Sequence, residues 1–209
     1  SEMFGKSKPP QNEKTLFQPR SVYAISKVFA YHSVIHYREA YGLHASNGIL
    51  FNHESPRRGV NFVTKKIVQG LVRIKQGKQK ILTLGNLYSR RDWGHAKDYV
   101  ESMWKILQYK NPDDFVIATK TSHSVKDFIN ICARKLNINL VWKNSGLKEV
   151  GINKLTKKII IKVDKKYFRE TEVDDLIGDF SKAKKLLKWK PKYSFNKLVD
   201  DMIYNELNG

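Results

Sequence analysis

The sequence is poor in cysteine, and this limits the chemistry open to the chain. Cys132 is the only cysteine among 209 residues, so an internal disulfide and a metal site built on cysteine are both excluded. A reducing compartment is therefore expected. No segment approaches the roughly 18 consecutive apolar residues that a membrane-spanning helix needs. Residues 1–5 show no basic leader before an apolar run, so a signal peptide is not expected either.

Acidic residues are also scarce. The chain has 20 Asp and Glu against 39 Lys and Arg, which gives a net charge of +19. Such a charge attracts anionic partners, for example nucleic acid or phosphorylated small molecules. The lysines are spread along the chain, however, which is equally typical of a solvated basic surface. Zinc-finger cysteines, a basic helix followed by heptads and an aromatic RNA-binding signature are missing. A basic nucleic-acid-binding module is therefore kept as an alternative that rests on charge alone.

Helical and strand-like apolar segments alternate along the chain. Apolar residues at helical spacing, with a serine cap at 21 and at 124, predict helices. These helices are expected at 21–41, 61–74, 93–110, 124–135, 181–187 and 194–207. Short apolar runs predict strands, and these are expected at 45–51, 81–84, 115–118, 140–142 and 159–161. This alternation favours an α/β fold with a parallel sheet.

One pair of side chains in the first helix points to chemistry. Tyr23 and Lys27 are four residues apart, so they lie on one face of a helix. A lysine ammonium beside a tyrosine hydroxyl favours the phenolate, which can act as a general base. The same spacing is common on surface helices, so the pair alone leaves open a packed tyrosine beside a solvated lysine.

The surrounding residues make the pair more specific. Residues 19–27 (PRSVYAISK) resemble the active-site helix of the extended short-chain dehydrogenase/reductase family, and residues 1–5 (SEMFG) resemble its catalytic loop. Three further blocks resemble stretches of the GDP-mannose 4,6-dehydratases within that family: GILFNHESPRRG at 48–59, RDWGHAKDYV at 91–100 and YFRETEVD at 167–174. Because the blocks occur in the right order over nearly the whole chain, the chain is identified as similar to this family.

The resemblance implies a role for each catalytic residue. Tyr23 would take the proton from the 4-hydroxyl of GDP-mannose, and Lys27 would hold the nicotinamide ribose of NADP. Glu2 would remove the C5 proton and help expel the 6-hydroxyl as water, a proton-transfer task that suits a carboxylate. The implied product is GDP-4-keto-6-deoxymannose, with no net consumption of NADP. A related epimerase or reductase is the alternative within the family, and Glu2 argues against it.

The resemblance also implies binding residues. NADP contacts are expected at Tyr23, Lys27, His53 and Arg58. Contacts with the GDP-sugar are expected at Asn52, Val63, Lys66, Arg91, Arg169 and Glu172. Arginine suits the diphosphate because it offers forked donors, and a glutamate can accept from guanine. Local alternatives stay open: the arginines at 57 and 58 could be solvated, His53 could be structural, and Arg169 and Glu172 could form a local ion pair.

The expected fold is the later strands of a doubly wound Rossmann-type parallel sheet plus a smaller α/β substrate-binding domain. Residues 1–59 and 90–119 would form the remainder of the NADP-binding domain, and 60–89 and 120–209 the GDP-sugar-binding domain. The Gly-rich strand-turn-helix that binds the dinucleotide pyrophosphate is missing, so this chain by itself is expected to be inactive. The resemblance further implies a cytoplasmic homo-oligomer, a dimer or tetramer, without a metal, membrane or nucleic-acid partner.

Overall fold

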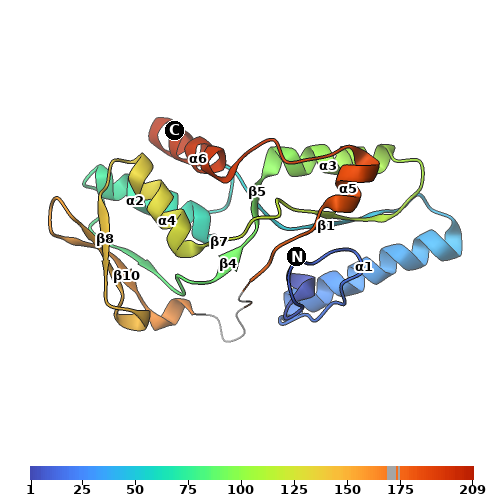
Figure 1. The fold of residues 1–209 in the computed structure, drawn as a ribbon, viewed down its shortest axis with the longest axis horizontal. Coiled ribbons are helices and arrows are strands. Elements are labelled where there is room, and N and C mark those ends of the chain that lie inside the picture. Colours follow the sequence, from blue (N-terminus) through green and yellow to red (C-terminus); the bar gives the residue numbers. More distant parts are fainter. Residues whose placement is uncertain (169–172, 174) are drawn as a thin grey trace. The chain divides into compact units, whose positions relative to one another are not determined.

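The computed structural model describes residues 1–168, 173 and 175–209 (Figure 1). The chain divides into two compact units. Unit 1 consists of residues 1–53, 90–122 and 171–194, and unit 2 consists of residues 54–89, 123–170 and 195–209. The main difference from the expected boundaries concerns 175–194, which were expected with the GDP-sugar-binding part but pack within unit 1.

Unit 1 is built on two parallel strands. Its elements are η1 (Glu2–Phe4), α1 (Val22–Tyr41), β1 (Asn47–Leu50), β2 (Asn52–Glu54, whose last residue is assigned to unit 2), β4 (Arg90–Arg91), β5 (Trp93–His95), α3 (Ala96–Gln108), β6 (Asp114–Ile117) and α5 (Ser181–Leu187). The strands β1 and β6 pair in parallel, with Ile49 opposite Val116. In Figure 1 the helix α1 lies on one side of this strand pair, and α3 and α5 lie on the other.

Alternate residues of β1 and β6 enter two different cores. Ile49 and Val116 belong to a cluster with Phe4 and the inner side of α1. Phe115 and Ile117 belong to a cluster with α3, α5 and Trp189. Both faces of the strand pair are therefore covered, which explains why these strands read as continuous apolar runs rather than as alternating ones. The second cluster also explains why 175–194 belong to unit 1.

Unit 2 combines three helices with a four-stranded sheet. Its elements are α2 (Val63–Lys75), β3 (Leu82–Leu84), β7 (His123–Ser124), α4 (Val125–Lys135), β8 (Leu140–Lys143), η2 (Gly146–Lys148), β9 (Val150–Asn153), β10 (Ile159–Val163), η3 (Lys165–Tyr167) and α6 (Phe195–Asn208). The helices α2, α4 and α6 pack on one another. The strand order is β3-β10-β9-β8.

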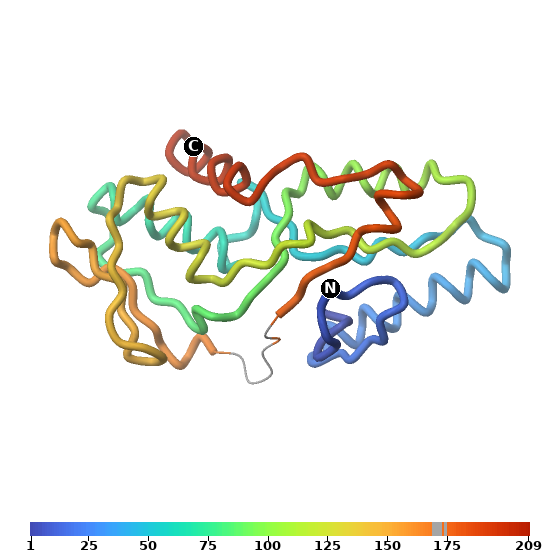
Figure 2. The backbone as a smooth tube through the Cα atoms, viewed as in Figure 1, coloured from blue at the N-terminus to red at the C-terminus, as the bar shows by residue number. Residues whose placement is uncertain are grey.

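The sheet of unit 2 is mixed. β3 and β10 are parallel, whereas β10, β9 and β8 are antiparallel to their neighbours, and Figure 2 shows the chain doubling back through 140–163. Among the described strands of this unit, only β3 and β10 are parallel, and the sequence predicted no strand at β9. Val150–Asn153 is short and contains a glycine, so its strand conformation depends on pairing with both neighbours rather than on local propensity.

The expected helix ends are confirmed. The side chain of Ser21 accepts a hydrogen bond from the Ala24 amide of α1 at 3.1 Å, and Gly42 follows the helix in the left-handed conformation at φ 63°. Ser124 and Asp127 form a reciprocal capping box at the start of α4. These local signals set where both helices begin because they satisfy amides that have no partner within the helix.

Candidate functional site

The tyrosine and lysine of the expected catalytic pair lie on one exposed side of α1. Ala24 is the only buried residue of this helix. Tyr23 is 61% exposed, and the Lys27 ammonium lies 5.4 Å from the centroid of the Tyr23 ring. The pair is therefore presented at the surface of unit 1 with its hydroxyl and ammonium accessible, which argues against a tyrosine that merely fills the core.

Glu2 lies next to the helix that carries this pair. It begins η1, which packs against α1. Its Oε1 atom is 4.0 Å from Nε of Arg91. Arg91 is only 7% exposed, and its Nη1 donates to the carbonyls of Arg90 and Val173 at 2.8 and 2.6 Å. The arginine is thus fixed by the backbone and places a positive charge close to the carboxylate.

The strand β2 carries two of the expected binding residues. The buried Oδ1 atom of Asn52 has no hydrogen-bond partner in the described part of the chain, and a buried unpaired acceptor is costly unless a ligand or water satisfies it. Nδ1 of His53 lies 2.9 Å from the Phe51 carbonyl. The His53 ring stacks on Tyr99, with a centroid distance of 4.7 Å.

Tyr99 holds its position because Gly94 has no side chain. A methyl group at Gly94 would overlap the Tyr99 ring, approaching its Cζ to 2.9 Å. Tyr99 is fully buried and so supports His53 from within unit 1. Both Gly94 and Tyr99 lie in the block 91–100, but the sequence alone assigned no role to either.

The loop after β2 belongs to unit 2 and holds Arg58. Its Nε atom is 3.1 Å from Oε2 of Glu54, and its guanidinium carbon is 3.4 Å from the centroid of the Phe62 ring. Burial raises the pKa of the Glu54 carboxyl, which accepts a hydrogen bond from Thr64 at 2.6 Å. Arg58 is therefore an ordered side chain, whereas Arg57 beside it is exposed.

Two expected substrate residues stand at the start of α2. Val63 is the first residue of the helix and is half-buried. The Lys66 ammonium lies 3.8 Å from the centroid of the Tyr167 ring. Tyr167 ends η3, directly after β10. The expected contacts at Arg169 and Glu172 lie outside the described residues.

Two aspartates of the block 91–100 have structural partners that the sequence did not reveal. Asp92 accepts hydrogen bonds from the amides of Thr119, Lys120 and Gly178 and from the Thr119 hydroxyl. Asp98 accepts from the amides of Lys192 and Tyr193 at 3.0 Å. Both hold the segment 175–194 in unit 1. The presence of each aspartate within a recognisable motif was the only sequence signal for its role. Its hydrogen-bond partners could not be predicted, because they lie far away in the sequence.

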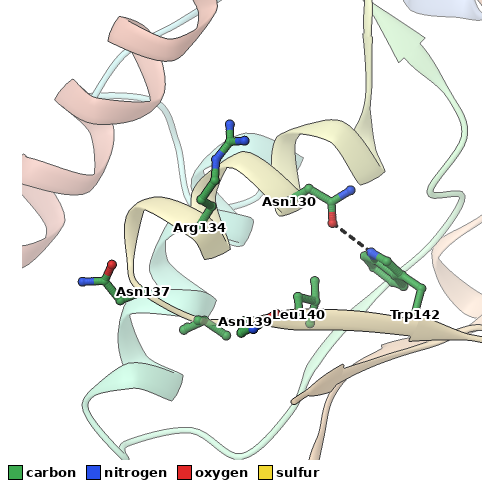
Figure 3. Close-up of a pocket in the computed structure, with 7 residues that line it drawn as sticks. Asn130, Arg134, Asn137, Asn139, Leu140 and Trp142 are labelled. Atoms are coloured by element: carbon green, nitrogen blue, oxygen red, sulfur yellow. Dashed lines mark hydrogen bonds between the residues drawn. The ribbon is translucent and has the colours of Figure 1, made fainter. Parts of the chain in front are cut away.

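Unit 2 also has an open groove. It has a volume of about 560 Å³ and lies in unit 2 between α4 and β8, lined by Asn130, Arg134, Asn137, Ile138, Asn139, Leu140 and Trp142 (Figure 3). The Trp142 indole donates to Asn130 at 2.8 Å across it. None of the expected site residues lines this groove.

No group of three or more His, Cys, Asp or Glu side chains in the described residues is arranged to hold a metal ion. No helix in the same part of the chain is both long and apolar enough to cross a membrane.

The family model and the most similar curated proteins that the comparison found share one description. Residues 1–202 match the family described as GDP-mannose 4,6 dehydratase. The GDP-mannose 4,6 dehydratase of Dictyostelium discoideum is 50% identical over 208 residues, which are 99% of this chain and 58% of the relative. The human protein of that name is also 50% identical, over 99% of this chain and 56% of its own length. Arabidopsis thaliana GDP-mannose 4,6 dehydratase 1 is 53% identical, over 99% of this chain and 53% of the relative. The chain thus spans only between half and three-fifths of these proteins.

Solved structures confirm the expected fold class. The RMD protein of Pseudomonas aeruginosa complexed with NADPH has a TM-score of 0.83 at 17% identity, over all of this chain and 64% of the other. The dTDP-glucose 4,6-dehydratase of Bacillus anthracis in complex with NAD has a TM-score of 0.78 at 19% identity, over 100% of this chain and 60% of the other. The fold is α/β, with strands of a Rossmann-type parallel sheet in unit 1.

Proposed function

The chain belongs to the GDP-mannose 4,6-dehydratase family, and we propose that its complete gene product converts GDP-mannose to GDP-4-keto-6-deoxymannose with NADP as cofactor. The observation that carries this proposal is the family match across residues 1–202, which contains the accessible Tyr23–Lys27 pair on α1. The match favours dehydration over the nucleic-acid-binding and the epimerase or reductase alternatives.

The residues present fit a nicotinamide cofactor. The accessible ammonium of Lys27 suits ribose hydroxyls. The ring of His53, supported by Tyr99, and the ordered guanidinium of Arg58 would add further contacts. When bound, NADP supplies the hydride chemistry, accepting a hydride from the sugar and returning it.

The chain's own residues would move the protons. Tyr23 would act as the general base that removes the proton of the sugar 4-hydroxyl, with the Lys27 ammonium beside it on α1. Glu2 would then take the acidic proton from C5 beside the new ketone and return it to the departing 6-hydroxyl. Arg91, 4.0 Å from Glu2, would hold this carboxylate in position by the attraction of opposite charges.

The expected contacts with the GDP-sugar follow from the family match. Asn52 and Arg91 in unit 1 would contact the sugar nucleotide. In unit 2, Val63 and Lys66 at the start of α2 would do the same. Contacts are also expected at Arg169 and Glu172, which lie outside the described residues. We therefore assign the larger share of NADP binding to unit 1, with Arg58 in unit 2, and two of the GDP-sugar contacts to α2 of unit 2. The α2 N-terminus and Lys66 both place positive charge where a diphosphate would be stabilised.

We also propose that the complete protein is a cytoplasmic homo-oligomer. On α1, Val22, Ile25 and Phe29 lie on one side of the helix and are all more than half exposed. Exposed apolar residues at helical spacing mark a surface that another protein surface covers. Sedimentation equilibrium of the complete protein and of its Phe29→Asp variant tests this. A native protein that is monomeric at micromolar concentration would contradict it.

The experiment that tests the activity uses the complete gene product and this chain side by side. Each is incubated with NADP and GDP-mannose, and the products are analysed by mass spectrometry. The proposal expects the complete protein to yield a nucleotide sugar lighter by one water, and it expects this chain alone to yield none. An altered sugar without loss of water would support an epimerase instead. Salt-sensitive binding to DNA with no conversion of GDP-mannose would support the nucleic-acid-binding alternative.

A further inference from the structure

Lys66 and Tyr167 form a close contact that joins two segments far apart in the sequence. The ammonium of Lys66, on the first turns of α2, lies 3.8 Å from the centroid of the Tyr167 ring. At this distance the positive charge is attracted to the negative face of the ring. Lys66 forms no ion pair with any carboxylate of the described residues, so the ring is its main electrostatic partner there. Within the described residues, no carboxylate neutralises the charge of this ammonium.

Tyr167 is held rigidly enough to position another side chain. It ends η3, which Asp164 caps by accepting a hydrogen bond from the Lys166 amide at 3.0 Å. The Asp164 amide in turn donates to the carbonyl of Leu84 at 2.9 Å. Tyr167 also packs directly on the backbone of Gly85, where an added methyl group would come within 3.1 Å of its Cβ atom. The tyrosine is thereby fixed to the end of β3.

The contact between Lys66 and Tyr167 lies by the carboxyl ends of two parallel strands, where ligands commonly bind. β3 and β10 are the parallel pair of unit 2, with Leu84 opposite Val163 at their carboxyl ends. Tyr167 follows the end of β10, and Gly85 follows the end of β3. Ligands of α/β sheets bind outside the carboxyl ends of parallel strands. The Tyr167 side chain is 44% exposed, so the pair is reachable from solvent.

We propose that Tyr167 is a positioning residue that holds the Lys66 ammonium in place to bind the diphosphate of the sugar nucleotide. This inference rests on the proposed function and adds to it a residue to which the sequence assigned no role. Without the aromatic face, the flexible stem of Lys66 would sample many conformations. The entropy of ordering it would then be lost on binding. The contact removes part of that cost before the substrate arrives.

The test is a double-mutant cycle on the complete gene product. Tyr167→Leu removes the aromatic face, and we expect KM for GDP-mannose to rise about two- to fivefold with kcat unchanged. Tyr167→Phe keeps the face and is expected to restore the KM of the native protein. Lys66→Met removes the charge itself, and we expect it to raise KM roughly tenfold or more. In the Lys66→Met background, Tyr167→Leu should change KM no further.

The remaining outcomes separate this inference from the function on which it rests. If Tyr167→Leu raises KM by the same factor in the native protein and in the Lys66→Met variant, the positioning role is overturned. An unchanged KM in the Tyr167→Leu single variant would also overturn it. Tyr204→Leu, which removes an exposed tyrosine from α6 in the same unit, is the matched control and should leave KM unchanged. A native protein that neither binds GDP by calorimetry nor converts GDP-mannose overturns the proposed function, and this inference with it.

Discussion

The carboxylate of Asp92 accepts a hydrogen bond from the Gly178 amide at 3.1 Å, across 86 residues of sequence. The same carboxylate accepts from the amides of Thr119 and Lys120. One buried side chain thus joins three separate segments of unit 1. Its four donors satisfy a charge that would otherwise be costly to bury.

Replacing Asp92 is expected to destabilise unit 1. In Asp92→Asn, one acceptor oxygen becomes an NH2 group facing amide donors, so at least one buried donor loses its partner. We expect a loss of about 2 to 3 kcal/mol in the free energy of unfolding. Urea denaturation followed by circular dichroism measures it. A variant as stable as the native chain would show that these hydrogen bonds make no net contribution.

The effect of Asp92 is also expected to depend on pH. Burial raises the pKa of this carboxyl to about 6, above the 3.8 of an unperturbed aspartate. Its contribution to stability is therefore largest below about pH 4 and falls as the pH rises to about 6. Asp92→Asn does not titrate in this range. The stability gap between the native chain and the variant should narrow by about 1 kcal/mol between pH 5 and pH 7. A gap that widens would contradict the raised pKa.

Gly178 is expected to tolerate no side chain. A methyl group there would overlap the Cβ atom of Ala118 and come within 2.7 Å of the Phe51 ring. Gly178→Ala should therefore cost about 2 kcal/mol or more, because both neighbours lie in the packed core of unit 1. Gly59→Ala is the matched control, since its methyl group would only touch the Phe62 ring at 3.5 Å. Equal melting temperatures for the two variants would contradict this packing argument.

Local sequence patterns correctly predicted those features that depend only on residues close together in the chain. The start of α4 follows from Ser124 and Asp127, and the shared side of Tyr23 and Lys27 follows from helical spacing. The strand β9 could not be predicted, because its conformation depends on partners on both sides. The support of His53 by Tyr99 was missed for the same reason. These contacts form only when segments distant in the sequence pack together, so the periodicity of apolar residues does not predict them.

The domain to which residues 175–194 belong could not be predicted from local sequence patterns either. Their place at the end of the sequence suggested the GDP-sugar-binding part. Trp189, however, donates to the Asp98 carbonyl at 2.9 Å and packs its ring against Phe180 and Tyr99. The segment therefore returns to unit 1, before α6 returns to unit 2. A chain that crosses five times between units leaves no compositional boundary for sequence analysis to detect.

Tyr23→Phe is expected to abolish most activity of the complete gene product without unfolding it. The change removes only the hydroxyl of an exposed side chain, so the thermal stability should stay within experimental error. Loss of a general base lowers kcat by about 100-fold or more. Ser33→Ala on the same helix is the control and should keep native activity. If Tyr23→Phe retains more than a tenth of the native kcat, this tyrosine is not the base.

Glu2→Gln is expected to separate substrate binding from dehydration. The amide keeps the shape of the side chain but cannot take a proton from C5, so formation of the dehydrated product should fall about 100-fold or more. Binding of GDP-mannose, measured by calorimetry, should change little, because the proposed role of Glu2 is exercised only during the reaction. Glu39→Gln replaces an exposed carboxylate on α1 and should leave both quantities unchanged. If Glu2→Gln weakens binding and turnover by the same factor, Glu2 contributes through binding. The proton transfer at C5 must then be assigned to another group.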